Sequence, residues 1–196
     1  PYDDELVIAG QGTIGLEILD QLPDVEAVVV PVGGGGLLAG VAFAIKSLRP
    51  DVKIYGVQAA GAASMYNAYR DHTYETLDHV DTFADGIAVK TPGETTFKMI
   101  EQYVDGIVTV SEDEIAAAIL ALMENQKLVA EGAGATPVAA ALFGKLPIEG
   151  KKTVCLISGG NIDVNILSRV ITRGMIMSGR KTNLMIALED LSLIHI

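Results

Sequence analysis

VVVPVGGGGLLAG, at residues 28–40, is the most informative stretch of this 196-residue chain. The apolar run over residues 27–32 is too short for a helix and is typical of a buried strand. Four glycines follow it at once, and residues 37–48 then carry the apolar pattern of a helix that stops before Pro50. A strand, a glycine turn and a helix in this order form the first part of a βαβ unit.

The glycine run at residues 33–36 has the properties of an anion site. Four glycines expose four backbone N–H groups without side chains in the way, and the helix that follows adds the positive end of its dipole. A merely flexible turn is the alternative, but flexibility here would cost stability without a gain. The run therefore predicts a phosphate site without indicating which phosphate it binds.

Strand and helix patterns alternate along the rest of the chain. We predict further strands at residues 6–9, 53–57, 107–110, 153–157 and 182–188, and helices at residues 13–22, 62–69, 94–104, 115–126, 136–146 and 161–173. Ser111 and Glu114 form a capping box before one of these helices, and residues 70–92 are mostly loop. The alternation indicates an α/β fold with an open, mostly parallel twisted sheet and helices on both faces.

A second glycine cluster, Ser158-Gly159-Gly160-Asn161, also follows a predicted strand. The carboxyl ends of parallel strands meet at one edge of a sheet, where ligands bind in such folds. We therefore expect both glycine clusters to face the same ligand. A serine that only caps or turns the chain is the alternative for Ser158.

Composition excludes several classes of protein. The formal net charge of −11 argues against nucleic-acid binding, because phosphates need a basic surface. No window of 18 uninterrupted apolar residues indicates a membrane span, and the absence of a secretory signal favours a cytoplasmic location. Cys155 is the single cysteine, so we interpret it as a small buried apolar residue. His72, His79 and His195 share no metal-ligand spacing.

A competing motif precedes the glycine run. Gly10-x-Gly12-x-x-Gly15 follows a short predicted strand, as a dinucleotide fingerprint should. That fingerprint also needs an acidic residue about 20 positions on, and none follows the second strand. A nicotinamide- or flavin-dependent oxidoreductase is thus one alternative function, and an inactive or regulatory binding module is another.

Six motifs, in their order along the chain, resemble the threonine dehydratase and serine racemase group of fold-type II pyridoxal-phosphate enzymes. They are VIAGQGTIGLEIL at 7–19, VVVPVGGGGLLAG at 28–40, ADGIAV at 84–89, VSEDEI at 110–115, AEGAGA at 130–135 and ISGGNID at 157–163. The resemblance implies that residues 1–173 form the large domain of a tryptophan synthase β-like fold, without its N-terminal segment and small domain. It also implies that the GQGT segment binds no dinucleotide.

The resemblance assigns a site to named residues. It implies that the phosphate of pyridoxal 5'-phosphate (PLP) is bound by Gly33, Gly34, Gly35, Gly36 and Leu37. It further implies that Ser158 contacts the pyridine nitrogen and that Gly86 and Glu131 lie near the ring. A neutral hydroxyl at the nitrogen makes the ring a milder electron sink, which suits α-proton removal followed by loss of the β-hydroxyl.

The activity that the resemblance implies is an ammonia-lyase reaction. The substrate is an amino acid, threonine or serine, and threonine would give 2-oxobutanoate and ammonia by α,β-elimination. Serine dehydratase and serine racemase, which share the fold, stay open as alternatives. A homo-oligomer is also expected from the family.

Two of the family's motifs are missing from this chain. These are the Phe-Lys-x-Arg-Gly-Ala pattern, whose lysine attaches to the cofactor, and a Ser-Gly-Asn loop. We expect both before Pro1, and we therefore predict no catalytic residue in this chain and no activity from it alone. The lysines without matching context include Lys46, Lys53, Lys90 and Lys98. Gln58 and Ser64 stand where related racemases have cation-binding carboxylates, so no metal site is expected.

The C-terminal sequence resembles a different module. SRVITRGMIMSGRKTNLMIAL, at 168–188, is similar to the linker and first strand of an ACT regulatory domain. We predict a truncated domain of this kind over residues 174–190, which in full would bind an amino-acid effector; an ordinary helix and strand is the alternative. LSLIHI, at 191–196, is what one reading frame of a common transposon-end sequencing adaptor would encode, and we expect it to be a non-native tail.

Overall fold

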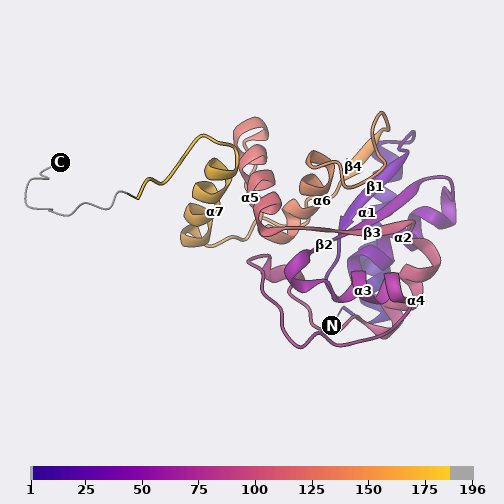
Figure 1. The fold of residues 1–196 in the computed structure, drawn as a ribbon. Helices are drawn as coiled ribbons and strands as arrows, with labels where there is room; N and C mark the ends of the chain where they lie inside the picture. The colour runs from indigo at the N-terminus through magenta and orange to yellow at the C-terminus, as the bar shows by residue number, and fades with distance from the viewer. Residues whose placement is uncertain (1, 186–196) are drawn as a thin grey trace, which may run out of the picture.

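The computed structural model describes residues 2–185, and a four-stranded sheet lies at the centre of this part (Figure 1). The strands are β1 (Ala27–Pro31), β2 (Lys53–Ala59), β3 (Gly106–Val110) and β4 (Thr153–Cys155). Their order is β3-β2-β1-β4, and each neighbouring pair is parallel. The register places Val29 beside both Tyr55 and Cys155. The predicted parallel α/β sheet is confirmed.

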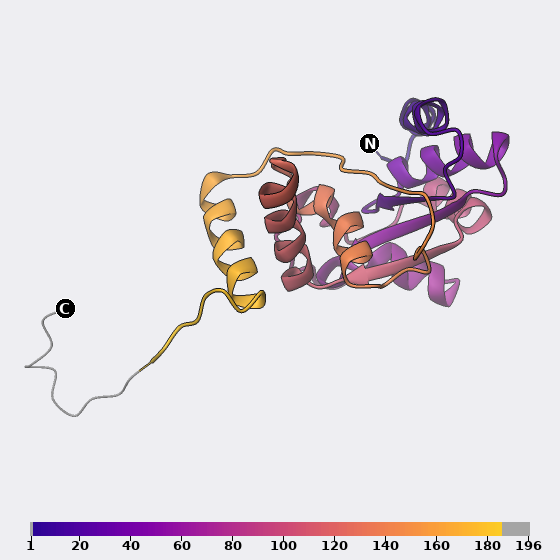
Figure 2. The ribbon, with the colours of Figure 1, turned by 90° about the horizontal axis from the view of Figure 1, so that it is seen from above.

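Helices cover both faces of the sheet, as Figures 1 and 2 show. The first face carries α1 (Glu5–Gln21), α2 (Gly36–Leu48), α3 (Ser64–Asp71) and α4 (Glu94–Tyr103), and the second carries α5 (Glu112–Ala121) and α6 (Gly132–Leu142). Successive residues of a strand point to opposite faces, so Val28 and Val30 enter the first core while Val29 enters the second. Burial on both faces explains why β1 is apolar throughout.

The last helix, α7 (Val164–Met177), packs on α5 at the side remote from the sheet (Figure 2). It continues four residues past the predicted domain boundary at 173. Residues 182–185 adopt no regular structure, so the strand predicted at 182–188 does not begin there, and its remainder lies outside the described residues. The predicted tail at 191–196 also lies outside them.

The predicted strand at residues 6–9 is wrong. These residues belong to α1, which Asp4 caps by accepting hydrogen bonds from the backbone N–H groups of Leu6 and Val7. A short apolar run does not distinguish a strand from a helix, and here packing on α2 selects the helix. The Gly-x-Gly-x-x-Gly motif therefore lies inside one helix. A dinucleotide fingerprint needs a turn between strand and helix, so this alternative is excluded.

Helices α5 and α6 also differ from prediction at their ends. The capping box of Ser111 and Glu114 is present, but α5 passes into a π-helix, η3 (Leu122–Gln126), before residue 126. Helix α6 begins at Gly132, four residues earlier than predicted. A Cβ at Gly134 would come within 2.8 Å of the Gly159 carbonyl oxygen, so a close tertiary contact offsets the low helix propensity of glycine.

Two short 3₁₀ helices, η1 (Ala60–Ala62) and η2 (Asp85–Ile87), lie within the connections. Among residues 2–185, no helix has both the length and the apolar character required to cross a membrane.

Candidate functional site

A cavity of about 240 Å³ lies at the carboxyl end of β1. Its lining includes every residue that the sequence predicted for the site, namely Gly33, Gly34, Gly35, Gly36, Leu37, Gly86, Glu131 and Ser158. These residues come from the β1–α2 loop, η2, the start of α6 and the loop after β4. A second cavity of about 310 Å³ adjoins the first and shares Gly86, Glu131 and Ala133 with it.

The glycine loop connects β1 to the N-terminus of α2 and requires glycine for two reasons. Gly35 has φ +100°, in the left-handed region, and a Cβ on it would lie 2.8 Å from both Met65 Cε and Thr96 Oγ1. A Cβ on Gly34 would collide with the ring of Tyr2. Neighbouring side chains therefore pack closely on the loop, and a side chain at either position would displace them.

The backbone N–H groups of the loop are available as hydrogen-bond donors. No backbone N–H of residues 33–37 donates to an acceptor in the described part of the chain. The N-terminus of α2 begins at Gly36, so its dipole adds positive potential at the same place. The described lining contains no lysine or arginine. This geometry suits a phosphate held by backbone groups alone, as the sequence predicted.

The opposite wall of the cavity is formed by Glu131, the N-cap residue of α6. Its backbone N–H donates to the Gly159 carbonyl oxygen at 3.0 Å. Its carboxylate occupies space that side chains would otherwise fill, because a Cβ at Gly159 would lie 2.5 Å from Oε1 and one at Gly86 would lie 3.3 Å from it. The glycines at 86 and 159 thus make room for the Glu131 carboxylate.

Ser158 reaches the cavity through the pairing of β4 with β1. The Leu156 N–H donates to the Val29 carbonyl oxygen at 2.9 Å, which continues the strand pairing past the end of β4. The loop that follows brings the exposed Ser158 to the cavity that the glycine loop lines. The expectation that both glycine clusters lie at one edge of the sheet is confirmed.

Several lining residues were not predicted from the sequence. They include Tyr2, Gln11, Ile87 and Val89. Ile87 and Val89 lie within the ADGIAV motif, which could have indicated them. Tyr2 had no local signal, because its position depends on a hydrogen bond from its hydroxyl to the Thr91 carbonyl oxygen, 89 residues away.

Two of the lysines that lack the family's motif context form ion pairs within the fold. Lys46 and Lys53 both form ion pairs with Asp105, at 2.7 and 2.8 Å. Burial alone would raise the pKa of Asp105, but the two lysines and the Ile54 N–H outweigh it and hold this pKa below its usual value. No lysine of the described residues lines the cavity.

Gln58 and Ser64 are buried within the protein's own hydrogen-bond network. Gln58 Oε1 accepts from the Tyr66 N–H at 2.9 Å, and Ser64 Oγ donates to the Val89 carbonyl oxygen at 2.7 Å. Cys155 packs against the second core, and burial raises the pKa of its thiol to about 11. This environment is that of a small apolar side chain and not of a reactive thiol.

Comparison with known sequences shows strong similarity over most of the chain. L-threonine ammonia-lyase of Thermotoga maritima is 58% identical over 181 residues, which make up 92% of this chain and 45% of that protein. The catabolic L-threonine dehydratase of Escherichia coli is 49% identical over 172 residues, 87% of this chain and 52% of that protein. The chain spans about half the length of these curated relatives.

Solved structures agree with the sequence matches. Threonine deaminase isoform 2 of Solanum lycopersicum superposes with a TM-score of 0.83 and 43% identity, over 89% of this chain and 48% of that one. Serine racemase of Dictyostelium discoideum gives a TM-score of 0.76 and 38% identity, over 83% of this chain and 52% of that one. Residues 1–160 match the family model described as pyridoxal-phosphate dependent enzyme. On the strength of this match and of the cavity geometry, the chain belongs to the pyridoxal-phosphate dependent enzyme family.

Proposed function

We propose that the polypeptide carrying this chain is an ammonia-lyase that converts L-threonine, or L-serine, to a 2-oxo acid and ammonia. The observation that carries the proposal is the single cavity that joins the glycine loop, Gly86, Glu131 and Ser158. The names of the relatives support the choice of reaction, because two of them are threonine ammonia-lyases or dehydratases.

PLP fits the residues of this cavity. The backbone N–H groups of residues 33–37 have no acceptor in the described chain and would hold the phosphate, and no side chain of the loop obstructs it. Ser158, at the neighbouring strand end, would hold the pyridine nitrogen through its hydroxyl. When bound, PLP supplies an electron sink for the charge that α-proton removal leaves on an amino acid.

The chain's own residues would set the conditions for that chemistry. A serine hydroxyl is neutral and does not force the pyridine nitrogen to carry a proton, as a carboxylate would. Glu131 lines the cavity beside Gly86 and Gly159, and keeps a carboxylate at the wall. No described lysine lines the cavity, so the reaction requires a lysine from elsewhere in the polypeptide to attach the cofactor.

The test is an assay of the full-length gene product with both amino acids. We expect 2-oxobutanoate from L-threonine and pyruvate from L-serine, and the ratio of kcat/KM values identifies the preferred substrate. Ser158→Ala should lower kcat/KM by about tenfold or more, as expected for loss of a hydrogen bond to a charged or polar ring atom. Ser168→Ala, at an exposed position of α7, is the matched control and should leave the activity unchanged.

If L-serine gives D-serine and no 2-oxo acid is formed, the enzyme is a racemase and not a lyase. If the protein binds PLP but neither L-threonine nor L-serine reacts, the proposed reaction is wrong, whereas the family assignment stands.

Assembly and regulation form a second part of the proposal. We expect the full-length protein to be a cytoplasmic homo-oligomer, and we expect residues 174–190 to begin an ACT-like domain that binds an amino-acid effector. The measurement is isothermal titration of the full-length protein with each of the proteinogenic amino acids. A protein whose threonine kinetics and heat of binding are unaffected by all of them would lack this effector site.

A further inference from the structure

We propose that Thr96 and Asp3, which lie outside the cavity lining, are positioning residues that aim the Gly35 N–H at the cofactor phosphate. The inference rests on the proposed PLP site and adds two residues to it, from α4 and from the segment before α1.

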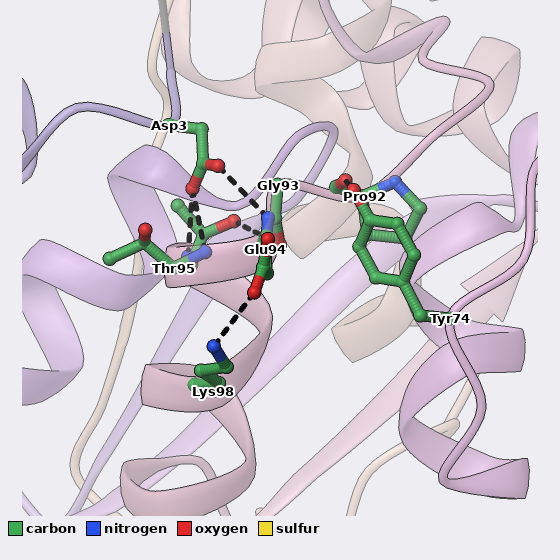
Figure 3. A network of polar contacts seen from close by, with 8 residues as sticks. Asp3, Tyr74, Pro92, Gly93, Glu94, Thr95 and Lys98 are labelled. Carbon is green, nitrogen blue, oxygen red and sulfur yellow. Dashed lines mark hydrogen bonds and ion pairs between the residues drawn. The ribbon is translucent and has the colours of Figure 1, made fainter.

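Asp3 caps a helix that lies about 90 residues away in the sequence (Figure 3). Its carboxylate accepts three hydrogen bonds from the first turn of α4, from the backbone N–H groups of Glu94 at 2.9 Å and of Thr95 and Thr96 at 3.0 Å each. The helix has Gly93 at its own N-cap position, which offers no side chain for this purpose. Asp3 thus supplies the cap that fixes the first turn of α4.

Thr96, in that first turn, connects α4 to the glycine loop. Its side chain is fully buried, and its Oγ1 donates to the Gly34 carbonyl oxygen at 2.6 Å. The Gly93 N–H donates to the same oxygen at 3.2 Å. Two donors from the start of α4 therefore hold the Gly34 carbonyl toward this helix.

The orientation of this carbonyl sets the orientation of the next N–H group. The Gly34 carbonyl and the Gly35 N–H belong to one planar peptide unit, and in a trans peptide they point in opposite directions. Because the carbonyl faces α4, the Gly35 N–H faces away from α4, and Gly35 itself is one of the residues that line the cavity. This N–H has no acceptor among the described residues, which is the state required of a phosphate donor.

The left-handed conformation of Gly35 makes this control necessary. Glycine reaches φ +100° at little cost but is equally free to leave it, so the residue type alone does not fix the peptide plane. The Thr96 hydroxyl and the Gly93 N–H supply the missing restraint. If the Thr96 hydrogen bond only stabilised the fold, its loss would not change the direction of the Gly35 N–H.

The test measures the Gly35 amide directly, in the full-length protein that carries this chain, by proton–nitrogen NMR of glycine- and leucine-labelled protein during titration with PLP and with inorganic phosphate. We expect a downfield shift of the Gly35 amide proton in the wild type and in Thr96→Ser, which keeps the hydroxyl. Thr96→Val, which has a similar shape without the hydroxyl, should lose most of this shift while the Gly36 and Leu37 amides still respond.

Affinity provides a second measurement. Thr96→Val should bind PLP about tenfold more weakly, the factor that corresponds to the loss of about 1.4 kcal/mol. It should bind pyridoxal, which has no phosphate, as the wild type does. Asp3→Ala should weaken PLP binding in the same direction. Its matched control is Asp4→Ala, which removes a comparable cap from α1 without contact to α4.

The outcomes separate this inference from the proposed function. If the wild type binds PLP and Thr96→Val shows an unchanged Gly35 shift and an unchanged ratio of PLP to pyridoxal affinity, the positioning role is wrong and the cofactor site stands. If Thr96→Ser behaves as Thr96→Val does, the hydroxyl is not the cause, and the role is equally wrong. If the wild type shows no response to PLP or phosphate, the site itself is wrong, and the inference falls with it.

Discussion

Gly35 and Gly144 both have a positive φ, but only Gly35 is crowded by its neighbours. Comparing substitutions at the two positions therefore separates the energetic cost of a strained backbone from that of a steric clash. The φ values are +100° at Gly35 and +62° at Gly144. A Cβ on Gly35 would lie 2.8 Å from Met65 and from Thr96, whereas one on Gly144 would meet nothing within 4 Å.

Alanine at the two positions should therefore destabilise the chain by different amounts. We expect Gly144→Ala to lower the free energy of unfolding by about 1 kcal/mol, the cost of a left-handed alanine. Gly35→Ala should cost a further ~1–3 kcal/mol because Met65 and Thr96 must move. Urea denaturation of both variants measures the difference, and equal costs would contradict the crowded environment of Gly35.

The partly buried thiol of Cys155 gives a prediction about pH. Burial raises its pKa to about 11, so the thiolate fraction at pH 8 is lower than that of a free thiol by a factor on the order of a hundred. We expect iodoacetamide to alkylate the folded chain correspondingly slowly at pH 8, with a rate that rises as the pH approaches 11. The chain unfolded in urea should react at the rate of a free thiol. Rapid alkylation of the folded chain at pH 8 would disagree with this burial.

At the scale of secondary-structure elements, the contact between α1 and α2 explains the Gly-x-Gly-x-x-Gly motif of residues 10–15, which resembles a dinucleotide fingerprint. Gly12 and Gly15 face α2, where a Cβ would come within 3.2 Å of the Gly40 carbonyl oxygen and 3.0 Å of the Val41 carbonyl oxygen. Gly10 is exposed, and a Cβ there would meet nothing within 4 Å. The spacing thus has a packing role for two glycines and none for the third.

The same helix should respond in opposite directions to the same substitution. Gly10→Ala should stabilise the chain by up to about 1 kcal/mol, because alanine has the higher helix propensity. Gly15→Ala should destabilise it by ~1–3 kcal/mol, because α1 must move away from α2. Thermal or urea denaturation checks both. If Gly15→Ala were neutral, the close approach of the two helices would not depend on this glycine.

Asp105, directly before β3, connects α2 to β2 and gives the sheet a pH-dependent contact. Its carboxylate pairs with Lys46 of α2 and Lys53 of β2 and accepts from the Ile54 N–H at 2.9 Å. Its pKa is lower in the folded chain than in the unfolded one, so the folded state binds fewer protons. The stability that it contributes is therefore present above an unfolded pKa of about 3.9 and is lost as the pH falls below that value.

Asp105→Asn should lower the free energy of unfolding at pH 7 by ~1–3 kcal/mol, since two lysines and an amide lose their charged acceptor. The difference between wild type and variant should shrink near pH 3. Urea denaturation at the two pH values measures it, with Asp51→Asn, an exposed carboxylate that pairs with Arg49, as the surface control. A difference that stays constant between pH 7 and pH 3 would show that charge on Asp105 is not the cause.

At the scale of the whole molecule, the cavity exists only because both cores are in place. The glycine loop depends on α2 and α4, which belong to the first core, whereas Glu131 and Ser158 depend on α6 and β4. A ligand that contacts both sides should stabilise the entire described fold and not one half of it.

PLP at a hundred times its dissociation constant should raise the free energy of unfolding of the chain by about 2.7 kcal/mol. Pyridoxal at the same concentration should raise it less, because it lacks the phosphate that residues 33–37 would bind, and NAD should not raise it. Differential scanning calorimetry measures the three shifts in Tm. Stabilisation by NAD but not by PLP would contradict the cofactor assignment.

Local pattern was sufficient for much of this molecule. The apolar run before residues 33–36 identified β1, and Ser111 with Glu114 identified the start of α5, because each signal lies within a few residues of the structure it forms. The placement of Gly33–Gly36 and Ser158 at one cavity was also predictable, because parallel strands place their carboxyl ends at one edge.

What local pattern could not supply depends on partners that are distant in the sequence. Residues 6–9 are helical because α1 packs on α2, and α6 starts at Gly132, where Gly134 lies close to the Gly159 carbonyl oxygen and the Glu131 N–H donates to it. Asp3 and Thr96 belong to no sequence motif. Hydrogen bonds across 62 to 93 residues nevertheless connect Asp3 to α4, and Thr96 to the Gly34 carbonyl oxygen. The sequence therefore specifies the glycine loop as a local conformation. The direction in which its peptides point comes from long-range contacts, since glycine has no side chain with which to hold its own backbone.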